Sequence, residues 1–236
     1  MTKTAVVTGA SSGIGRGIAH KFGEEGWEVT LVARRKSNLE KVAKEVEEAG
    51  GKAHVFVTDL TKEGNPDAAV QFAIEKMGKV GLLVNNAGMG RFEMVPDIKD
   101  KSYQEQFQLN VWACMAMVRS IVSHFKENGA GQIISIGSIV GFKGISKGSI
   151  YSSTKWALRG LNESWREELY PDNIKSCYIG PGFVLSEFNG RDEEGTAELR
   201  EWAMTSADIA HFAYSVATQG PNSDIKEMSI EVLDRS

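Results

Sequence analysis

Short runs rich in apolar and β-branched residues alternate along the chain with longer segments whose apolar residues recur at helical spacing. The short runs predict strands, and the longer segments predict amphipathic helices. The predicted strands are residues 4–8, 28–32, 53–57, 80–84, 132–136, 175–179 and 225–232. Strands separated by helices pair in parallel, so we expect a doubly wound α/β fold: a mostly parallel, seven-stranded sheet with helices on both faces.

Helical stripes of apolar residues lie between the predicted strands. The clearest are Ile14, Ile18 and Phe22; Phe107, Val111, Cys114, Val118, Val122 and Phe125; and Leu158, Leu161, Trp165 and Leu169. No fixed repeat or linker divides the chain, so residues 1–236 are expected to form a single domain. The densest polar stretch, residues 187–201, is flanked by Phe188 and Trp202 and is typical either of a lid or of a solvated loop.

The composition narrows the class of protein. Of the 236 residues, 42% are apolar and 25% are charged, which excludes a disordered or collagen-like chain. The net charge of −4 lacks the basic excess of a nucleic-acid binder. Cys114 and Cys177 match neither a disulfide framework nor a metal-ligand pair, which favours a cytoplasmic setting. No stretch has the length and apolarity of a signal peptide or membrane span, so no membrane is expected as a partner.

A glycine-rich turn, Thr8-Gly9-Ala10-Ser11-Ser12-Gly13-Ile14-Gly15, joins the first predicted strand to the first helical stripe. Glycine lacks a Cβ, so backbone N–H groups of such a turn can approach a pyrophosphate at the positive end of the helix. A strand, a turn of this kind and a helix in succession indicate a dinucleotide site. Its expected residues are Gly9, Ser11, Ser12, Gly13, Ile14 and Gly15.

Further motifs follow in a definite order. They are Asn85-Asn86-Ala87-Gly88 after the fourth strand, Asn110 in the long helical segment, Ser138 after the fifth strand, Tyr151 and Lys155 as Y-x-x-x-K, and Pro181-Gly182 after the sixth strand. With the glycine-rich turn, this set resembles the short-chain dehydrogenase/reductase family over residues 4–185. The resemblance implies a Rossmann-type fold and an oxidoreductase that uses a nicotinamide cofactor.

Four residues carry the expected chemistry. Tyr151 and Lys155 lie one helical turn apart on the same face, so the ammonium is expected to lower the pKa of the phenol and make Tyr151 a general acid/base. Ser138 is expected at the carboxyl edge of the sheet, where its hydroxyl can donate to a substrate oxygen. By resemblance, Asn110 holds a water that connects Lys155 to solvent, and Lys155 also reaches the nicotinamide ribose.

Cofactor choice is expected to depend on the end of the second strand. Ala33 stands where NAD-specific sites place a carboxylate, and Arg34 can bind the 2′-phosphate of NADP(H), with Arg35 and Ser11 adding to it. The remaining cofactor contacts that the resemblance implies are Asp59 and Leu60 beside the adenine, Asn86, Ala87 and Gly88 at the adenosine ribose, and Pro181, Gly182, Val184 and Ser186 toward the nicotinamide, together with Tyr151 and Lys155.

The substrate is expected to be a small-molecule carbonyl or hydroxy compound. Expected substrate-facing positions are Ile139, Val140, Phe142, Phe183 and the segment 187–202. The histidines, His20, His54, His124 and His211, show no metal-ligand spacing, so no metal is expected. Residues 225–232 lack the Asp-Gly-Gly turn common in the family, and a glycine-free ending of this kind slightly favours 3-hydroxy acids and serine as substrates.

These features predict an NADP(H)-dependent carbonyl reductase or alcohol dehydrogenase. The alternative is a non-catalytic protein of the same fold that senses NADP(H) or binds a partner. The larger branch that modifies nucleotide sugars carries an added substrate domain, for which 236 residues leave no room. The helices around 107–125 and 150–169 are apolar on more than one face, including Trp112, Met115, Trp156 and Trp165, with Gly160 allowing close approach. They are therefore expected to form the interface of a homodimer or homotetramer.

Overall fold

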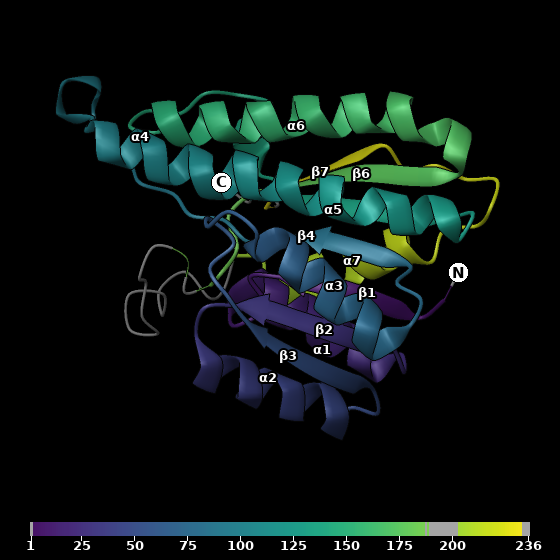
Figure 1. Ribbon diagram of the computed structural model, residues 1–236. Coiled ribbons are helices and arrows are strands. Elements are labelled where there is room, and N and C mark those ends of the chain that lie inside the picture. Colours follow the sequence, from purple (N-terminus) through teal and green to yellow (C-terminus); the bar gives the residue numbers. More distant parts are fainter. Residues whose placement is uncertain (1, 187, 189–202, 233–236) are drawn as a thin grey trace.

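A central sheet organises the molecule (Figure 1). The structure is a computed structural model, which describes residues 2–186, 188 and 203–232. Its strands are β1 Thr4–Thr8, β2 Glu28–Ala33, β3 Lys52–Val57, β4 Leu82–Asn85, β5 Gly131–Ile136, β6 Ile174–Pro181 and β7 Glu227–Ile230. The spatial order is β3-β2-β1-β4-β5-β6-β7, and every neighbouring pair is parallel. The predicted doubly wound, seven-stranded Rossmann-type sheet is therefore confirmed.

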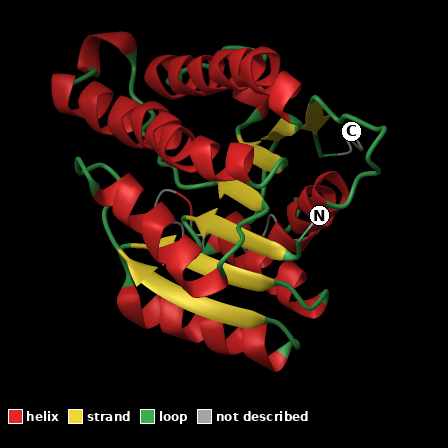
Figure 2. Ribbon diagram, turned by 45° about the vertical axis from the view of Figure 1, so that its right-hand side comes forward, coloured by secondary structure: helices red, strands yellow, loops and turns green. Residues whose placement is uncertain are grey.

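Helices cover both faces of this sheet (Figure 2). The α-helices are α1 Gly13–Glu24, α2 Lys36–Glu48, α3 Asn65–Met77, α4 Asp100–Phe107, α5 Cys114–Glu127, α6 Ser149–Leu169 and α7 Ser206–Ala217. Short turns of 3₁₀-helix are η1 Val95–Asp97, η3 Ile139–Gly141 and η4 Tyr170–Asp172, and η2 Gln108–Ala113 is a π-helical segment. None of the helices in the described ranges is both long enough and apolar enough to cross a bilayer.

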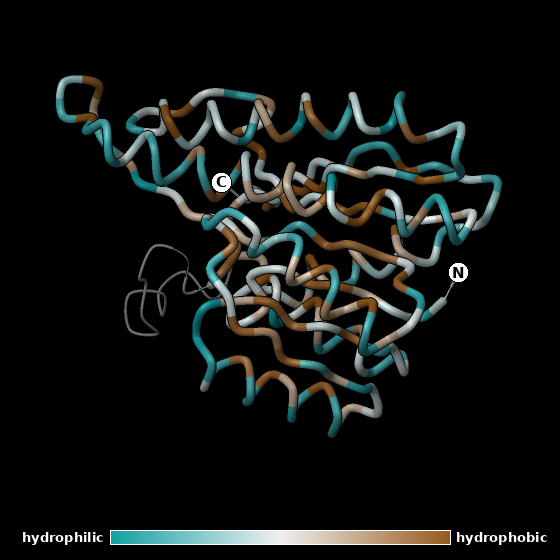
Figure 3. The backbone as a smooth tube through the Cα atoms, viewed as in Figure 1, coloured by the Kyte–Doolittle hydropathy of each residue, from teal (hydrophilic) through white to brown (hydrophobic). Residues whose placement is uncertain are grey.

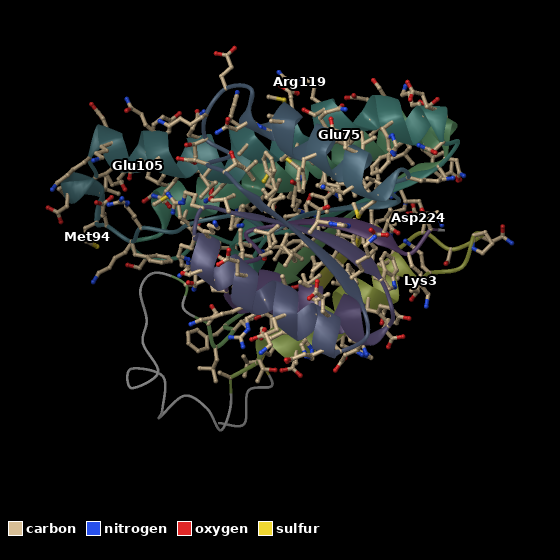
Figure 4. The ribbon with its side chains drawn as sticks, turned by 60° about the horizontal axis from the view of Figure 1, so that its bottom comes forward. Lys3, Glu75, Met94, Glu105, Arg119 and Asp224 are labelled. Atoms are coloured by element: carbon tan, nitrogen blue, oxygen red, sulfur yellow. The ribbon has the colours of Figure 1, made fainter. Side chains whose placement is uncertain are left out.

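The hydrophobic core has two layers, one on each side of the sheet. Helices α1, α2 and α7 bury Phe22, Leu39 and Ile209 on one side, and α3, α5 and α6 bury Val70, Phe125 and Leu158 on the other. The strands between them are apolar on both faces, as parallel strands require, and appear as brown stretches in Figure 3. Charged side chains such as Glu75, Glu105 and Arg119 project from the outside of the helical layers (Figure 4).

The long helical stripe from Phe107 to Phe125 belongs to a helix that changes pitch. Helix α4 ends at Phe107, η2 continues it as a π-helical segment, and α5 carries it on to Glu127. Segments of π-helix recur at functional sites because they re-aim side chains. Asn110 lies within η2, so the polar residue that interrupts the apolar stripe lies where the helix geometry changes.

The strand order reverses between β1 and β4, which lie side by side although α1 to α3 separate them in sequence. Crossovers leave these two strands toward opposite edges of the sheet, so the turns after them separate and leave a crevice at the carboxyl ends of the strands. The glycine-rich turn follows β1, and the Asn86-Ala87-Gly88 motif follows β4. The fold thereby brings the two motifs together.

Candidate active site

A cleft of about 890 Å³ opens at the carboxyl ends of the strands. Its walls come from the turns after β1, β2, β3, β4, β5 and β6 and from the start of α6. The predicted cofactor and catalytic residues that line it are Gly9, Ser11, Ser12, Gly13, Ile14, Arg34, Arg35, Asp59, Leu60, Asn86, Ala87, Gly88, Ser138, Tyr151, Lys155, Pro181, Gly182, Val184 and Ser186. Gly15 and Asn110 were predicted too, but they do not line the cleft.

The glycine-rich turn has the shape that a phosphate site needs. Gly9 and Gly13 adopt φ values of +65° and +53°, which side chains rarely tolerate. A Cβ on Gly9 would lie 2.8 Å from the Ala87 Cα atom. A Cβ on Gly15 would lie 2.4 Å from the Asn86 side chain and 2.5 Å from the Gly9 carbonyl oxygen, so Gly15 supports the turn from behind.

Thr8 connects the two turns at the switch point. Its hydroxyl accepts hydrogen bonds from the backbone N–H groups of Asn86 and Ala87, at 2.9 and 3.0 Å, and donates to the Val84 carbonyl at 3.2 Å. The Asn86 amide donates to the Thr8 carbonyl at 2.9 Å. These bonds hold the glycine-rich turn and the Asn86-Ala87-Gly88 segment as one rigid wall. Sequence reasoning had given Thr8 no role.

The basic end of the cleft comes from Arg34 and Arg35. Arg35 reaches across to the glycine-rich turn and donates to the Ser11 hydroxyl at 3.1 Å and to the Ser12 hydroxyl. Arg34 is exposed, and within the described ranges no hydrogen bond or ion pair engages it. Both guanidinium groups therefore stand at the same end of the cleft, and Arg35 is already anchored there.

Asp59 lies at the same end, after β3. Partial burial opposes ionisation of its carboxyl group, but hydrogen bonds from the Thr61 side chain and backbone outweigh it and lower the pKa of Asp59. The Asp59 Oδ1 atom accepts from the Thr61 hydroxyl at 2.8 Å and from the Thr61 N–H at 3.0 Å. This carboxylate stays charged at neutral pH.

Tyr151 and Lys155 lie near the start of α6, as predicted, and both are buried. The Lys155 Nζ atom donates to the Ile136 carbonyl at 3.1 Å and lies 5.7 Å from the centre of the Tyr151 ring. Burial lowers the pKa of Lys155 to about 8, which the nearby Cys114 only partly opposes. Burial also raises the pKa of Tyr151, against the lowering effect of its hydrogen bond with Ser138.

The expected direction of the Tyr151 pKa shift was therefore wrong for the protein without bound cofactor. The sequence suggested that the Lys155 ammonium would bring the phenol toward neutral pH. In the structure desolvation of the ring dominates, and the group that opposes it is the Ser138 side chain. Tyr151 is consequently a protonated phenol at neutral pH, ready to donate.

Ser138 lies between β5 and η3 and caps the N-terminus of η3. Its hydroxyl oxygen accepts from the Val140 N–H at 3.3 Å, so the hydroxyl proton is left to donate into the cleft. A hydrogen bond joins the Ser138 and Tyr151 side chains, so the two hydroxyl groups lie side by side at the cleft wall. The structure thus brings Ser138, Tyr151 and Lys155 together.

Asn110 lies behind this group. Its amide oxygen accepts from the Met89 N–H at 2.8 Å, and its amide nitrogen donates to the Met89 carbonyl at 2.7 Å and the Thr154 hydroxyl at 3.0 Å. A Cβ on Gly88 would lie 3.3 Å from the Asn110 oxygen and 3.7 Å from the Lys155 nitrogen. Asn110 and Lys155 therefore face the same glycine, and the amide oxygen retains one lone pair for a further donor.

The opposite end of the cleft from Arg34 is apolar and aromatic. The Tyr151 ring lies 5.5 Å from the ring of Phe92 and 5.8 Å from that of Phe188, measured between ring centroids. Phe188 belongs to the segment 187–202 that was expected to face the substrate, whereas Phe92 was given no role from the sequence. In the sequence Phe92 lies in a loop with no motif, so no local signal marked it.

Some substrate-facing predictions agree with the geometry and some do not. Ile139, Val140 and Phe183 line the cleft. Phe142 does not, and that prediction was wrong: its ring packs edge-on against Tyr178 and under the Arg159 guanidinium. Apart from Phe188, the predicted segment 187–202 lies outside the described residues. The histidines lie elsewhere: His54 pairs with Glu28, for example, and His124 accepts from the Val80 N–H.

The cleft fits a nicotinamide dinucleotide. A cradle of glycines that a Cβ would fill faces the N-terminus of α1, as a pyrophosphate requires. Two guanidinium groups stand at one end, and the Ser138, Tyr151 and Lys155 side chains stand toward the other. These are the donor groups that a phosphorylated ribose and a reacting carbonyl would use.

Comparisons with known proteins identify the family of this chain. The model of the family described as short chain dehydrogenase matches residues 3–197. The chain is 31% identical to an L-2,3-butanediol dehydrogenase from Corynebacterium glutamicum, over 81% of this chain and 80% of the relative.

Solved structures show the same likeness. An alcohol dehydrogenase from the archaeon Thermococcus sibiricus, solved with 5-hydroxy-NADP, is 27% identical with a TM-score of 0.88, over 98% of this chain and 96% of the other. A 3-ketoacyl-(acyl-carrier-protein) reductase from Brucella melitensis, complexed with NADH, is 27% identical with a TM-score of 0.87, over 97% of this chain and 96% of the other.

Proposed function

The chain belongs to the short-chain dehydrogenase family of oxidoreductases, and we propose that it transfers a hydride between NADP(H) and a neutral carbonyl compound or the corresponding alcohol. The observation that carries the proposal is the convergence of Ser138, Tyr151 and Lys155 at one end of a cleft whose other end holds Arg34 and Arg35. We take residues 1–236 as one domain that performs this reaction.

The roles of the residues follow from their chemistry. Bound nicotinamide supplies or accepts the hydride. The Ser138 hydroxyl donates to the substrate oxygen as negative charge develops there, and Tyr151, a neutral phenol, transfers its proton to that oxygen. Lys155, with its pKa near 8, holds a positive charge behind the phenol at neutral pH and stabilises the phenolate that remains.

The proton that Tyr151 gives up would be replaced from solvent through Lys155 and a water beside Asn110. The two side chains face Gly88, and the free lone pair of the Asn110 amide oxygen can accept from a water beside the lysine. The buried hydrogen bonds to Met89 and Thr154 fix the amide in one orientation. Asn110 then acts as an anchor for a relay rather than as a group that touches the substrate.

The preference for NADP(H) rests on charge. Arg34 and Arg35 put two positive groups where a 2′-phosphate would lie, and Ala33 offers no carboxylate to repel it. Ser11 and Ser12 hold Arg35 in place for this contact. An NAD(H)-specific site would instead present an acidic group to the ribose hydroxyls.

A neutral, partly apolar substrate fits the end of the cleft that holds Ser138, Tyr151 and Lys155. Phe92 and Phe188 flank the Tyr151 ring, and Arg91, which also lines the cleft, is paired with Glu105. These rings favour a small ketone or aldehyde that carries an apolar group beside the reacting carbonyl.

The test is a panel of ketones, aldehydes, diketones and 3-hydroxy acids assayed with NADPH, NADH and their oxidised forms. We expect steady NADPH oxidation with neutral carbonyl compounds. Cofactor binding without turnover of any member of the panel would instead indicate a sensor of the same fold.

A further inference from the structure

Tyr178 is a buried phenol that belongs to none of the motifs above. It lies in β6, where it pairs with Ser135 of β5 and Glu227 of β7, and only 1% of it is exposed. It does not line the cleft. Its hydroxyl donates to the Ser138 carbonyl at 2.9 Å and accepts from the Ser138 N–H at 3.0 Å. One phenol therefore satisfies both backbone groups of the serine that faces the substrate.

The place of Ser138 explains why it needs such a partner. The Gly137 N–H still donates to the Ile179 carbonyl of β6, at 2.7 Å, but the chain then leaves the sheet to form η3. Ser138 is extended, with φ −168° and ψ 160°, and its carbonyl also accepts from the Gly141 N–H at 2.9 Å. The Tyr178 hydroxyl replaces the backbone partner that the sheet no longer supplies to the Ser138 N–H.

Glycines make room for this phenol. A Cβ on Gly137 would lie 1.9 Å from the Tyr178 Cζ atom, and a Cβ on Gly141 would lie 2.2 Å from the Tyr178 hydroxyl oxygen. Any side chain at either position would displace the ring. Gly137 and Gly141 lie on either side of Ser138 in the sequence, so the residues around the serine leave the space that the Tyr178 ring occupies.

The ring is held from its other side as well. Phe142 packs edge-on against it, with ring centroids 5.6 Å apart, and the Arg159 guanidinium lies 4.4 Å from the centre of the Phe142 ring. Arg159 donates to both carboxylate oxygens of Glu227, at 2.9 and 3.2 Å. Arg159 belongs to α6, the helix that carries Tyr151 and Lys155. The phenol therefore has little freedom to move relative to the reacting groups.

We propose that Tyr178 is a positioning residue for the reaction: its hydroxyl fixes the Ser138 peptide so that the serine hydroxyl faces Tyr151 and the substrate oxygen. The inference rests on the proposed function, in which Ser138 binds that oxygen. A misplacement of a reacting group by a fraction of an ångström lowers the turnover rate without abolishing binding. Tyr178 then affects kcat through Ser138 and leaves the cofactor site unchanged.

The hydroxyl keeps its proton under all ordinary assay conditions. Burial raises the pKa of Tyr178 to about 12, although its hydrogen bond with the Ser138 backbone opposes the shift. A neutral phenol can donate and accept at the same time, as the two bonds to Ser138 require. The positioning effect is therefore independent of pH across the working range.

The first experiment is Tyr178→Phe, which keeps the ring and removes both hydrogen bonds to Ser138. We expect kcat for carbonyl reduction to fall roughly tenfold, with the dissociation constant for NADPH unchanged. The matched control is Tyr214→Phe, which removes a hydroxyl that donates to Glu25 at 2.9 Å, and it should leave kcat unaltered. An unchanged kcat in Tyr178→Phe would overturn the proposal.

A double-mutant cycle with Ser138→Ala separates positioning from general destabilisation. If Tyr178 acts through the serine, Tyr178→Phe loses its effect on kcat once Ser138 is alanine. An equal fold-loss in both backgrounds would mean that Tyr178 acts independently of Ser138, and the inference would be wrong. Full activity of Ser138→Ala by itself would instead contradict the proposed function, so the two failures are distinguishable.

The pH profile gives an independent readout. The Ser138 side chain lowers the pKa of Tyr151, and Tyr178 itself has a smaller raising effect on it. The larger effect, loss of the serine hydrogen bond, sets the direction, so releasing the serine should raise the pKa of Tyr151. In alcohol oxidation the phenolate is the base, and the positive charge of bound oxidised nicotinamide lowers the phenol pKa toward the assay range, so activity rises with pH through that pKa. We expect the rising limb of the kcat/KM profile to move to higher pH in Tyr178→Phe and to stay in place in Tyr214→Phe. A profile that Tyr178→Phe leaves unmoved would contradict the positioning role.

Discussion

The Lys155 ammonium nitrogen lies 5.7 Å from the centre of the Tyr151 ring, from a position one helical turn further along α6. The same nitrogen donates a hydrogen bond to the Ile136 carbonyl. Both groups are buried, and burial shifts their pKa values in opposite directions, upward for the phenol and downward for the ammonium. The two groups have nearly equal pKa values in water, so these opposite shifts separate them and make the ammonium the stronger acid of the pair.

The first prediction concerns Tyr151. Tyr151→Phe removes the transferable proton and keeps the packing against Phe92 and Phe188, so turnover should fall by roughly 10²- to 10⁴-fold while NADPH binding persists. Steady-state kinetics and a fluorescence titration with NADPH would measure both. Tyr170→Phe, at an exposed tyrosine, is the control. Turnover within a few-fold of wild type would remove Tyr151 from the mechanism.

The second prediction is that Lys155 lowers the stability of the protein. The unfolded chain holds the Lys155 proton up to about pH 10.5, whereas the folded protein releases it near pH 8. Below pH 8 the folded state therefore bears the full free-energy cost of a buried ammonium, and this cost disappears as the pH rises toward 10.5. Lys155→Met should raise the free energy of unfolding by up to about 3 kcal/mol at pH 7 and by much less at pH 10, while turnover falls.

Thermal unfolding of both proteins at pH 7 and pH 10, without added cofactor, measures this difference. Lys175→Met is the control, because Lys175 is a lysine whose ammonium bonds backbone carbonyls at the surface. A melting temperature for Lys155→Met below that of wild type at pH 7 would show that the bond to Ile136 outweighs the desolvation of the ammonium.

The third prediction concerns cofactor preference. One charge-assisted contact to the 2′-phosphate contributes about 1.5–3 kcal/mol, so Arg34 should favour NADPH over NADH by roughly ten- to a hundredfold in kcat/KM. The double change Ala33→Asp with Arg34→Ala should reverse the preference, because the new carboxylate repels the phosphate and accepts from the ribose hydroxyls.

Arg35→Ala tests the anchored neighbour, and we expect it to reduce the NADPH preference as well. Lys36→Ala removes a positive charge from the same helix terminus outside the cleft and should change the preference little. A double mutant that still prefers NADPH by the wild-type factor would mean that Arg34 does not bind the 2′-phosphate.

The fourth prediction concerns assembly through α5 and α6. Trp165 is buried in its own subunit, but Trp156 is 49% exposed, and nothing lies within 4 Å of a Cβ placed on Gly160 one turn further along α6. Light scattering at micromolar concentration should show a dimer or tetramer, and Trp156→Glu should dissociate it. Val57→Glu, at an exposed valine on the far edge of the sheet, should not. A wild-type species of 25.8 kDa would contradict the prediction.

Patterns that act over short distances were predictable from the sequence. The apolar strands, the glycine-rich turn and the Tyr151–Lys155 spacing each depend on local geometry, since a strand, a tight turn or one helical turn is fixed by neighbouring residues. The ordered motifs then placed Ser138 and Arg34 at the carboxyl edge, because parallel strands present their turns at one edge of a sheet. The strands observed in the structure agree with those predictions to within a few residues.

The tertiary structure decided what depends on contacts between distant segments. It hydrogen-bonded Arg35 to Ser11, packed Phe142 against Tyr178 outside the cleft lining, and hydrogen-bonded the Tyr178 phenol to the Ser138 backbone, 40 positions away in the sequence. It also decided the protonation of Tyr151, because desolvation depends on the aromatic and aliphatic groups that surround the ring and not on the lysine four positions along. Burial and long-range hydrogen bonds are properties of the packed chain, so a linear pattern can name the reacting groups but cannot fix their proton affinities or what holds them in place.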